Sequence, residues 1–313
     1  MLTRWSFQQG DAVSSRLNKV KVKFYQWGGA VVLMLALTLP VQASIVNPEW
    51  LQARLQQEDL LVVDVRPPED FLKGHIQGSV NLEPMSLFAD QFLLPPISEL
   101  QRLLGGVGID HERKVVILGN HEFIWAARLY WVLEFLGHTQ VHLLDTAWGH
   151  WEEGLLPVSQ EPQVPVARTF IPQVDSSRFM TQLGTLAAIG HLPILDGRTE
   201  AHYLGKNPGG ALRAGHIPTA QHFPWTQNRE QIDGVYRLRD LDSLRSVYEG
   251  LPKDQTIVLY CTGSAQAALN YVVMQELGYQ VSVYEGSWSE WGNNLSLPKV
   301  NPSHKRTEAG ANE

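Results

Sequence analysis

The chain of 313 residues has a single cysteine, Cys261, and therefore cannot form an internal disulfide. It also lacks an excess of basic residues, because 25 Lys and Arg stand against 32 Asp and Glu and the formal net charge is −7. Such a chain offers no basic face to a phosphate backbone, which argues against a nucleic acid as partner. No His, Cys, Asp and Glu cluster has the spacing of a metal site, so we expect neither a metal nor another cofactor.

Long hydrophobic runs are also missing, except for one near the N-terminus. Basic residues between 19 and 23 precede an apolar run at 27–39, which is shorter than the ~18 residues of a membrane span. Small residues follow, up to Ala43, and this order is typical of a secretory signal. We therefore predict a signal peptide at residues 1–43 and export to the bacterial periplasm, with membrane attachment only if this leader stays uncleaved.

Short apolar runs predict strands that are buried on both faces of a parallel sheet: 60–65, 114–119, 192–197 and 256–261. Helical patterns lie between them. Leu269, Val272, Val273 and Leu277 fall on one face of a helix that Gly278 can end in a left-handed conformation. The alternation predicts an α/β fold of doubly wound type, in which ligands bind beyond the carboxyl ends of the strands.

The pattern occurs twice. "KGHIQGSVNLE" at 73–83 returns as "AGHIPTAQHFP" at 214–224, so that Gly215 follows Gly74 by 141 positions, as Gly278 follows Gly137. We therefore expect two repeated domains, and we place their bounds as follows: a first domain at 44–155, a proline-rich linker at 156–170, a second domain at 171–298 and a disordered tail at 299–313.

Cys261 lies where a predicted strand ends and a helix begins. The residues after it are mostly small: Thr262, Gly263, Ser264, Ala265 and Gln266. Small side chains let backbone N–H groups approach a ligand, and these groups favour a negative charge on the sulfur. We expect them to lower the thiol pKa and to hold a thiolate or a persulfide. The alternative is a buried structural cysteine, but such a residue has no reason to occupy this turn.

The repeats resemble the tandem-domain rhodaneses of exported bacterial type, which are thiosulfate and 3-mercaptopyruvate sulfurtransferases. The resemblance covers residues 48–298 and rests on four stretches: "VVDVRPPEDFLKGHIQGSVNL", "ILDGRTEAHYLGKNPGGALRAGHIPTAQHFPW", "YCTGSAQAALNYVVMQELGY" and "VYEGSWSEWGNN". It implies two rhodanese-like domains, each a mainly parallel sheet with helices on both faces. It also implies that Cys261 takes a sulfane sulfur from a small anionic donor as a persulfide and passes it to a thiol or a cyanide-like acceptor.

The resemblance also assigns roles within the repeats. Asn120 stands where Cys261 stands in the second copy, so the first domain has no nucleophile and the second is the catalytic one. The loop from Thr262 to Gln266 is expected to bind the donor. Arg198 either holds the anionic end of the donor or forms a structural pair with Asp196, and the two roles are compatible. The chain is expected to be a monomer.

Other residues that could be mistaken for catalytic groups occur in both copies. His75 and His216 lie in the two "GHI" turns, although only one copy has the thiol, so we expect them to fix the turns by hydrogen bonds. Trp288 and Trp291 have counterparts in the first copy and are expected to pack.

The donor and the activity stay open at this stage. The loop after Cys261 contains no cation for a doubly charged donor such as thiosulfate, whereas Leu204 replaces an arginine that mercaptopyruvate enzymes tend to have. A phosphatase is disfavoured, because its loop ends in arginine six residues after the cysteine and Ala267 occupies that position. The remaining alternative is a non-catalytic module for sulfur binding, redox sensing or protein interaction.

Overall fold

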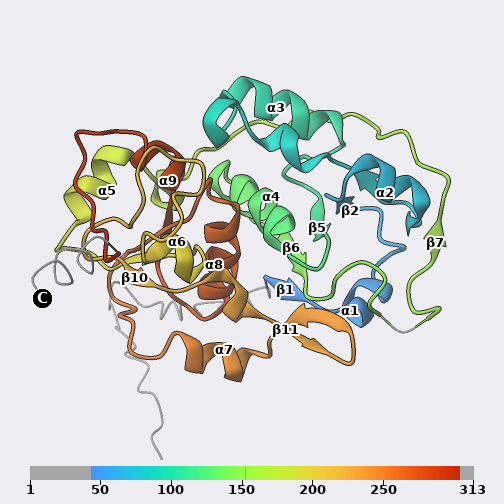
Figure 1. Cartoon of the computed structure of the whole chain (residues 1–313). Coiled ribbons are helices and arrows are strands. Elements are labelled where there is room, and N and C mark those ends of the chain that lie inside the picture. The colour runs from blue at the N-terminus through green and yellow to red at the C-terminus, as the bar shows by residue number, and fades with distance from the viewer. Residues whose placement is uncertain (1–43, 152, 304–313) are drawn as a thin grey trace, which may run out of the picture. The chain divides into compact units, whose positions relative to one another are not determined.

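Two parallel five-stranded sheets carry the fold of the described residues, which are 44–151 and 153–303 of a computed structural model (Figure 1). The first sheet has the order β1-β6-β5-β2-β4, and the second has the order β8-β14-β13-β9-β10. Their strands are β1 (Ile45–Val46), β2 (Leu60–Asp64), β4 (Val80–Asn81), β5 (Lys114–Leu118), β6 (Val141–Leu144), β8 (Phe179–Met180), β9 (Ile194–Asp196), β10 (Gln221–His222), β13 (Ile257–Tyr260) and β14 (Val281–Tyr284). The identical order confirms the predicted repeat of one α/β unit.

Both faces of each sheet are covered. In β13, Ile257 and Leu259 belong to one hydrophobic cluster, whereas Val258 and Tyr260 belong to another on the opposite face. This alternation is the side-chain period of a strand, with both sides apolar because both are buried. The helices of the first domain are α1 (Pro48–Gln52), α2 (Pro68–Lys73), α3 (Ile97–Gly106) and α4 (Ile124–Phe135); those of the second are α5 (Gln182–Ala188), α6 (Glu200–Tyr203), α7 (Leu241–Val247), α8 (Ala265–Glu276) and α9 (Ser287–Trp291).

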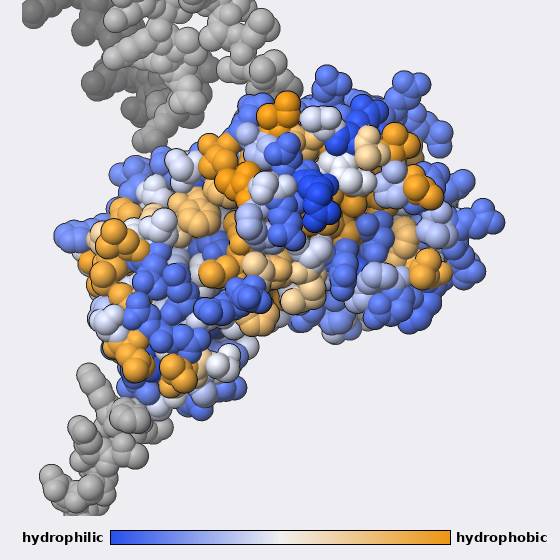
Figure 2. All heavy atoms as spheres, turned by 90° about the horizontal axis from the view of Figure 1, so that it is seen from above, coloured by the Kyte–Doolittle hydropathy of each residue, from blue (hydrophilic) through white to orange (hydrophobic). Residues whose placement is uncertain are grey.

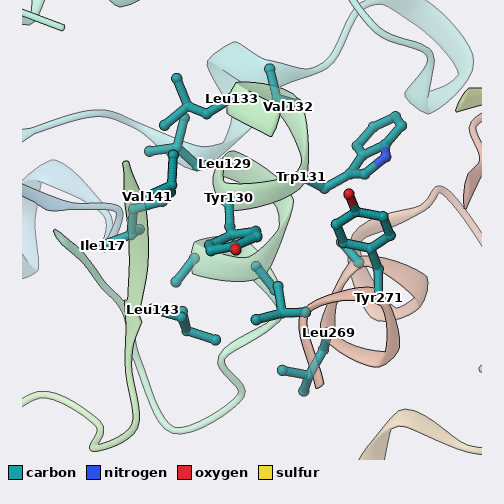
Figure 3. Close-up of a cluster of buried hydrophobic side chains, with 14 of the residues drawn as sticks. Ile117, Leu129, Tyr130, Trp131, Val132, Leu133, Val141, Leu143, Leu269 and Tyr271 are labelled. Carbon is teal, nitrogen blue, oxygen red and sulfur yellow. The ribbon is translucent and has the colours of Figure 1, made fainter. Parts of the chain in front are cut away.

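The helices α4 and α8 join the two domains. Side chains from both helices and from one face of each sheet form a single hydrophobic cluster, which we call the central cluster. Figure 3 shows Leu269 and Tyr271 of α8 facing the α4 residues Tyr130 and Trp131. The predicted one-sided apolar face of α8 is therefore too narrow, because Ala267, Asn270 and Met274 are buried as well. Each helix packs on its own sheet and on the helix of the other domain.

In each domain a segment reaches toward the other domain; it follows β4 in the first domain and β10 in the second. In the first domain it contains the 3-10 helices η1 (Pro84–Leu87) and η2 (Asp90–Phe92). In the second it contains η4 (Trp225–Asn228) and the antiparallel hairpin of β11 (Arg229–Ile232) and β12 (Val235–Leu238). Leu238 N–H of this hairpin donates to Asp145 O over 2.8 Å, and Ala147 N–H donates to Tyr236 O over 3.2 Å.

The segments outside the sheets differ in part from their predicted bounds. The linker 156–170 includes β7 (Val158–Ser159), which pairs with β3 (His75–Ile76) of the first domain. The expected disorder of 299–313 is wrong for 299–303, because Val300 and His216 exchange two backbone hydrogen bonds. The predictions for 1–43 and 304–313 lie outside the described residues.

Figure 2 shows hydrophobic and hydrophilic residues interspersed on the face seen from above. Within the described residues, no helix is both long enough and apolar enough to cross a membrane.

Candidate active site

Cys261 follows β13 directly, at the carboxyl end of the strand and before α8. β13 lies beside β9, and the chain leaves these neighbouring strands toward opposite edges of the sheet, β10 on one side and β14 on the other. In α/β sheets this is the point at which ligands bind. The thiol is nevertheless only 1% exposed. The predicted position of Cys261 at a strand end is thus confirmed, and in this structure the sulfur is closed off from solvent.

Backbone N–H groups of the loop point their positive ends at the sulfur. Burial raises the pKa of the Cys261 thiol above its ordinary value, while hydrogen bonds from the N–H groups of Ala267, Gly263 and Gln266 lower it. Gly263 and Gln266 belong to the predicted loop, whereas Ala267 lies one residue beyond it. The expected net lowering of the thiol pKa is wrong for this closed structure. The free-energy penalty of removing the thiolate from water is larger than the stabilisation that three neutral N–H dipoles provide. A thiolate here needs a further source of positive potential or an opening to solvent.

Ser287 holds the loop after Cys261 in place by hydrogen bonds. Its Oγ accepts hydrogen bonds from the backbone N–H groups of Cys261 over 3.1 Å and of Ser264 over 3.2 Å, and it donates to Tyr284 O over 2.9 Å. The sequence analysis missed this residue. Its counterpart in the first domain is Ala147. The signal that could have found Ser287 is that this position has a hydroxyl only in the repeat that contains the cysteine.

Gly263 is required by a contact from the first domain. A Cβ atom at Gly263 would lie 2.6 Å from Cβ and 3.1 Å from Cγ of Phe92, the last residue of η2. The insert of the first domain thus lies directly on the loop. This contact explains why the glycine comes two residues after Cys261, because another side chain would displace the covering segment.

Arg198 lies in a buried structural network. Its guanidinium donates to both carboxylate oxygens of Asp196, with a closest distance of 2.6 Å, and to Gly215 O over 2.7 Å. It also stacks 4.4 Å from the ring centre of Trp288. The first domain repeats this arrangement with Arg66, which donates to both carboxylate oxygens of Asp64 and to Gly74 O and lies over Trp148.

Because the arrangement recurs beside Asn120, it does not depend on the thiol. It favours the structural role of Arg198. Its role in donor binding stays a prediction.

The two "GHI" histidines fix turns, as expected. Nδ1 of His75 donates to Phe71 O over 3.0 Å, and Nδ1 of His216 donates to Tyr203 O over 2.7 Å. Each imidazole also stacks on the ring of the residue to which it donates, with ring centres 3.9 Å and 4.0 Å apart. Trp288 and Trp291 pack in a buried cluster below the second sheet, as predicted.

A buried cation reaches the loop from the first domain. Arg128, on α4, is fully buried, and its Nη1 donates to Oγ of Ser264. Its Nη2 lies 3.5 Å from Oε1 of Glu285 and donates to Leu87 O over 3.2 Å. Sequence reasoning missed Arg128 because it looked for a cation within the loop after Cys261, whereas this one comes from the other repeat.

In the part of the chain that the structure describes, no group of three or more His, Cys, Asp or Glu side chains is placed to hold a metal ion.

Comparisons with known proteins agree with this architecture. The profile of a family described as "Rhodanese-like domain" matches residues 47–154 and 180–294. The chain is 32% identical over 276 residues to the "Sulfur carrier protein TtuD" of Thermus thermophilus, covering 81% of this chain and 95% of the relative. It is also 32% identical over 263 residues to a "Thiosulfate sulfurtransferase" of Azotobacter vinelandii, covering 81% and 96%. The solved structure of SseA from Escherichia coli, a 3-mercaptopyruvate sulfotransferase, has the same fold with a TM-score of 0.68 and 21% identity, covering 79% of this chain and 99% of that one.

Proposed function

The chain belongs to the rhodanese-like domain family and contains two copies of the domain; from this premise we propose that it is a sulfurtransferase that carries a sulfane sulfur on Cys261. The observation that carries the proposal is the placement of the one thiol of the chain. Cys261 lies at the carboxyl end of β13, with the N–H groups of Gly263, Gln266 and Ala267 directed at its sulfur. Asn120 occupies this position in the first domain and cannot act as a nucleophile.

The reaction has two steps that share the persulfide. First, the Cys261 thiolate attacks the outer sulfur of the donor, a sulfur–sulfur bond forms, and the electron pair of the broken bond leaves on sulfite if the donor is thiosulfate. If the donor is 3-mercaptopyruvate, the carbon–sulfur bond breaks and the thiol proton ends on carbon, giving pyruvate. Second, a thiol or cyanide attacks the outer sulfur of the persulfide, and Cys261 leaves as a thiolate. The backbone N–H groups stabilise the anionic sulfur in both the free and the loaded enzyme.

We propose mercaptopyruvate as the better donor. Thr262, Ser264 and Gln266 have side chains that can donate hydrogen bonds but carry no charge. Thiosulfate brings two negative charges, and the loop from Thr262 to Gln266 itself contains no cation; the cation that reaches it, Arg128, is shared with Glu285. Against this stands Leu204, which is typical of the thiosulfate branch.

A sulfur-binding module without turnover is the second candidate function. The observation in its favour is the closed site: Cys261 is buried, and burial raises the pKa of its thiol. A persulfide held there would be protected from solvent, as suits a carrier that gives up its sulfur only to a docked partner.

Intact mass of the purified chain tests the proposal. After incubation with either donor, we expect a gain of one sulfur on wild type and none on Cys261→Ser, because a hydroxyl oxygen cannot hold a sulfane sulfur. Cyanide should then remove the added mass with formation of thiocyanate over many cycles. A Cys261→Ser variant that retains a tenth of wild-type turnover would refute the role of the thiol, and loading without turnover would favour the carrier.

We also propose that the protein works in the periplasm as a monomer. Basic and apolar residues at 19–39 and the small residues up to Ala43 support cleavage before Ser44. N-terminal sequencing of protein from a periplasmic extract tests this, and a start at Met1 in the cytoplasm would contradict it.

A further inference from the structure

The first domain contains no thiol, yet one of its side chains is bound to the sulfur loop of the second. We propose that Arg128 is a positioning residue of the active site, which holds the loop at Ser264 and supplies the positive charge that an anionic sulfur at Cys261 requires. The inference rests on the proposed function and adds to it a residue that lies outside the sulfur-binding domain.

Arg128 contacts the loop of the second domain while its guanidinium lies over the rings of Phe88 and Trp131 of its own domain. Nη1 donates to Oγ of Ser264, the residue whose backbone N–H is held by Ser287. Ser264 has φ 62°, a left-handed conformation that is unfavourable for a residue with a side chain. Phe123 has the same φ in the first domain, so this conformation belongs to the repeat, and Ser287 and Arg128 add two hydrogen bonds at Ser264 from different domains.

The partners of Arg128 neutralise its positive charge only in part. Its Nε is buried without a hydrogen-bond partner, and the contact with Glu285 is an ion pair at 3.5 Å rather than a close hydrogen bond. Burial lowers the pKa of Arg128 to about 10, and negative charge on Glu285 and on Cys261 raises it. The guanidinium thus stays protonated at neutral pH, and it contacts the loop in a site closed to water, where charges interact strongly.

Other charges near the sulfur do not provide this potential. Asp196 opposes a thiolate, and its carboxylate is paired with Arg198 and accepts from the hydroxyl of Tyr260 over 2.6 Å. Glu285 is negative when ionised, and burial raises its pKa, whereas Arg128 and the N–H of Leu94 lower it. In the described residues, Arg198 and Arg128 each have one buried nitrogen without a hydrogen-bond partner, but Arg198 is paired with Asp196 at 2.6 Å, whereas Arg128 is paired with Glu285 at 3.5 Å.

The repeat provides an internal comparison. The residue that corresponds to Arg128 in the second domain is Leu269, and the residue that corresponds to Ser264 in the first is Phe123, each at a separation of 141. Both are buried members of the central cluster. The loop with the thiol is thus contacted through the pair Arg128 and Ser264. The equivalent pair at the Asn120 loop, Leu269 and Phe123, is apolar. Burying a charge costs free energy. If Arg128 only stabilised the contact between the domains, an arginine at position 269 of the second repeat would serve equally well, yet that residue is Leu269.

The single cysteine allows a direct measurement of the potential at the sulfur. Iodoacetate and iodoacetamide are similar in size but differ by one negative charge, so the ratio of their alkylation rate constants reports local potential and cancels the effect of burial. We expect Arg128→Met to lower the iodoacetate-to-iodoacetamide ratio roughly tenfold, and Glu285→Gln to raise it, because removing these groups changes the potential in opposite directions. Intact mass follows the reaction, and the measurement does not depend on sulfur transfer.

A matched control is available at the same interface. Arg178 lies 3.5 Å from Glu134 of α4 and donates to the hydroxyl of Tyr271 over 2.9 Å, but its described contacts do not include the loop. Arg178→Met should leave the ratio unchanged, and Arg128→Lys should restore most of it. If Arg128→Met proves too unstable to purify, Glu285→Gln alone and the pair Arg128→Met/Glu285→Gln, which leaves no unpaired buried charge, decide the question.

An unchanged ratio in Arg128→Met, or in the paired variant relative to Glu285→Gln, would overturn the proposal. So would an equal fall in the Arg178→Met control. If instead the ratio changes as expected while donors never load Cys261, the role of Arg128 stands and the proposed sulfur transfer fails.

Discussion

The substitution Gly263→Ala tests whether the first domain covers the sulfur loop. The added methyl would lie 2.6 Å from Cβ and 3.1 Å from Cγ of Phe92, closer than packed carbon atoms approach. Forcing one methyl into a packed contact costs about 1–3 kcal/mol. We expect this loss in the free energy of unfolding, measured by urea denaturation, together with slower loading of sulfur because the Gly263 N–H is displaced.

The partner substitutions make the prediction specific. Phe92→Gly removes both clashing atoms and suits the φ of 63° at this position, so it should restore most of the loss. Phe92→Ala keeps the Cβ at 2.6 Å and should restore only a small part. A coupling of about 1–2 kcal/mol between positions 263 and 92 is expected from such a contact.

The control is Gly106→Ala at the end of α3, where an added Cβ meets nothing within 4 Å. It should be neutral or slightly stabilising. If Gly263→Ala destabilises the wild-type protein and the Phe92→Gly variant equally, Phe92 does not contact Gly263 as the structure shows.

Three further substitutions test other parts of the argument. Arg198→Ala should lower the free energy of unfolding by about 3–5 kcal/mol, since it leaves the Asp196 carboxylate buried and unpaired; a raised KM for the donor with unchanged urea unfolding would instead favour donor binding. His138 has a pKa lowered to about 4 by burial, so stability that is complete above its ordinary value of 6.5 should fall by about 3 kcal/mol as the pH drops through 4, and His138→Gln should remove this part of the acid sensitivity. Thr262→Arg should raise kcat/KM for thiosulfate relative to mercaptopyruvate in side-by-side assays with cyanide, and no change in that ratio would show that loop charge does not select the donor.

The sequence was sufficient for the features that depend on local pattern. The strands at 60–65 and 256–261 are continuous apolar runs, and these residues form β2 and β13 with both faces buried. Gly137 and Gly278 end the two long helices with positive φ of 86° and 81°, as expected from their place after the last apolar residue. The position of Cys261 at a strand end followed from the same pattern.

What the sequence left open depends on contacts between the repeats. Arg128 and Phe92 are each more than a hundred residues from the loop that they contact, and periodicity carries no signal across such distances. The thiol pKa was misjudged for the same reason, because the loop residues indicate the N–H dipoles but not the burial that the other domain imposes. Comparison of the two repeats position by position, which singles out Arg128 against Leu269 and Ser287 against Ala147, was the signal that could have found them.

The central cluster restricts how a donor can reach the sulfur. A hinge motion that parted α4 from α8 would expose side chains such as Trp131, Leu269 and Tyr271 to water, at about 1.5–3 kcal/mol for each large apolar residue. A few such residues would equal the whole stability of an ordinary domain, which is about 5–15 kcal/mol. Phe92, which covers Gly263, is by contrast 47% exposed and has less apolar surface to lose to water. Movement of Phe92 away from Gly263 would therefore expose less apolar surface than separation of the two domains, and donor entry past Phe92 would cost less free energy.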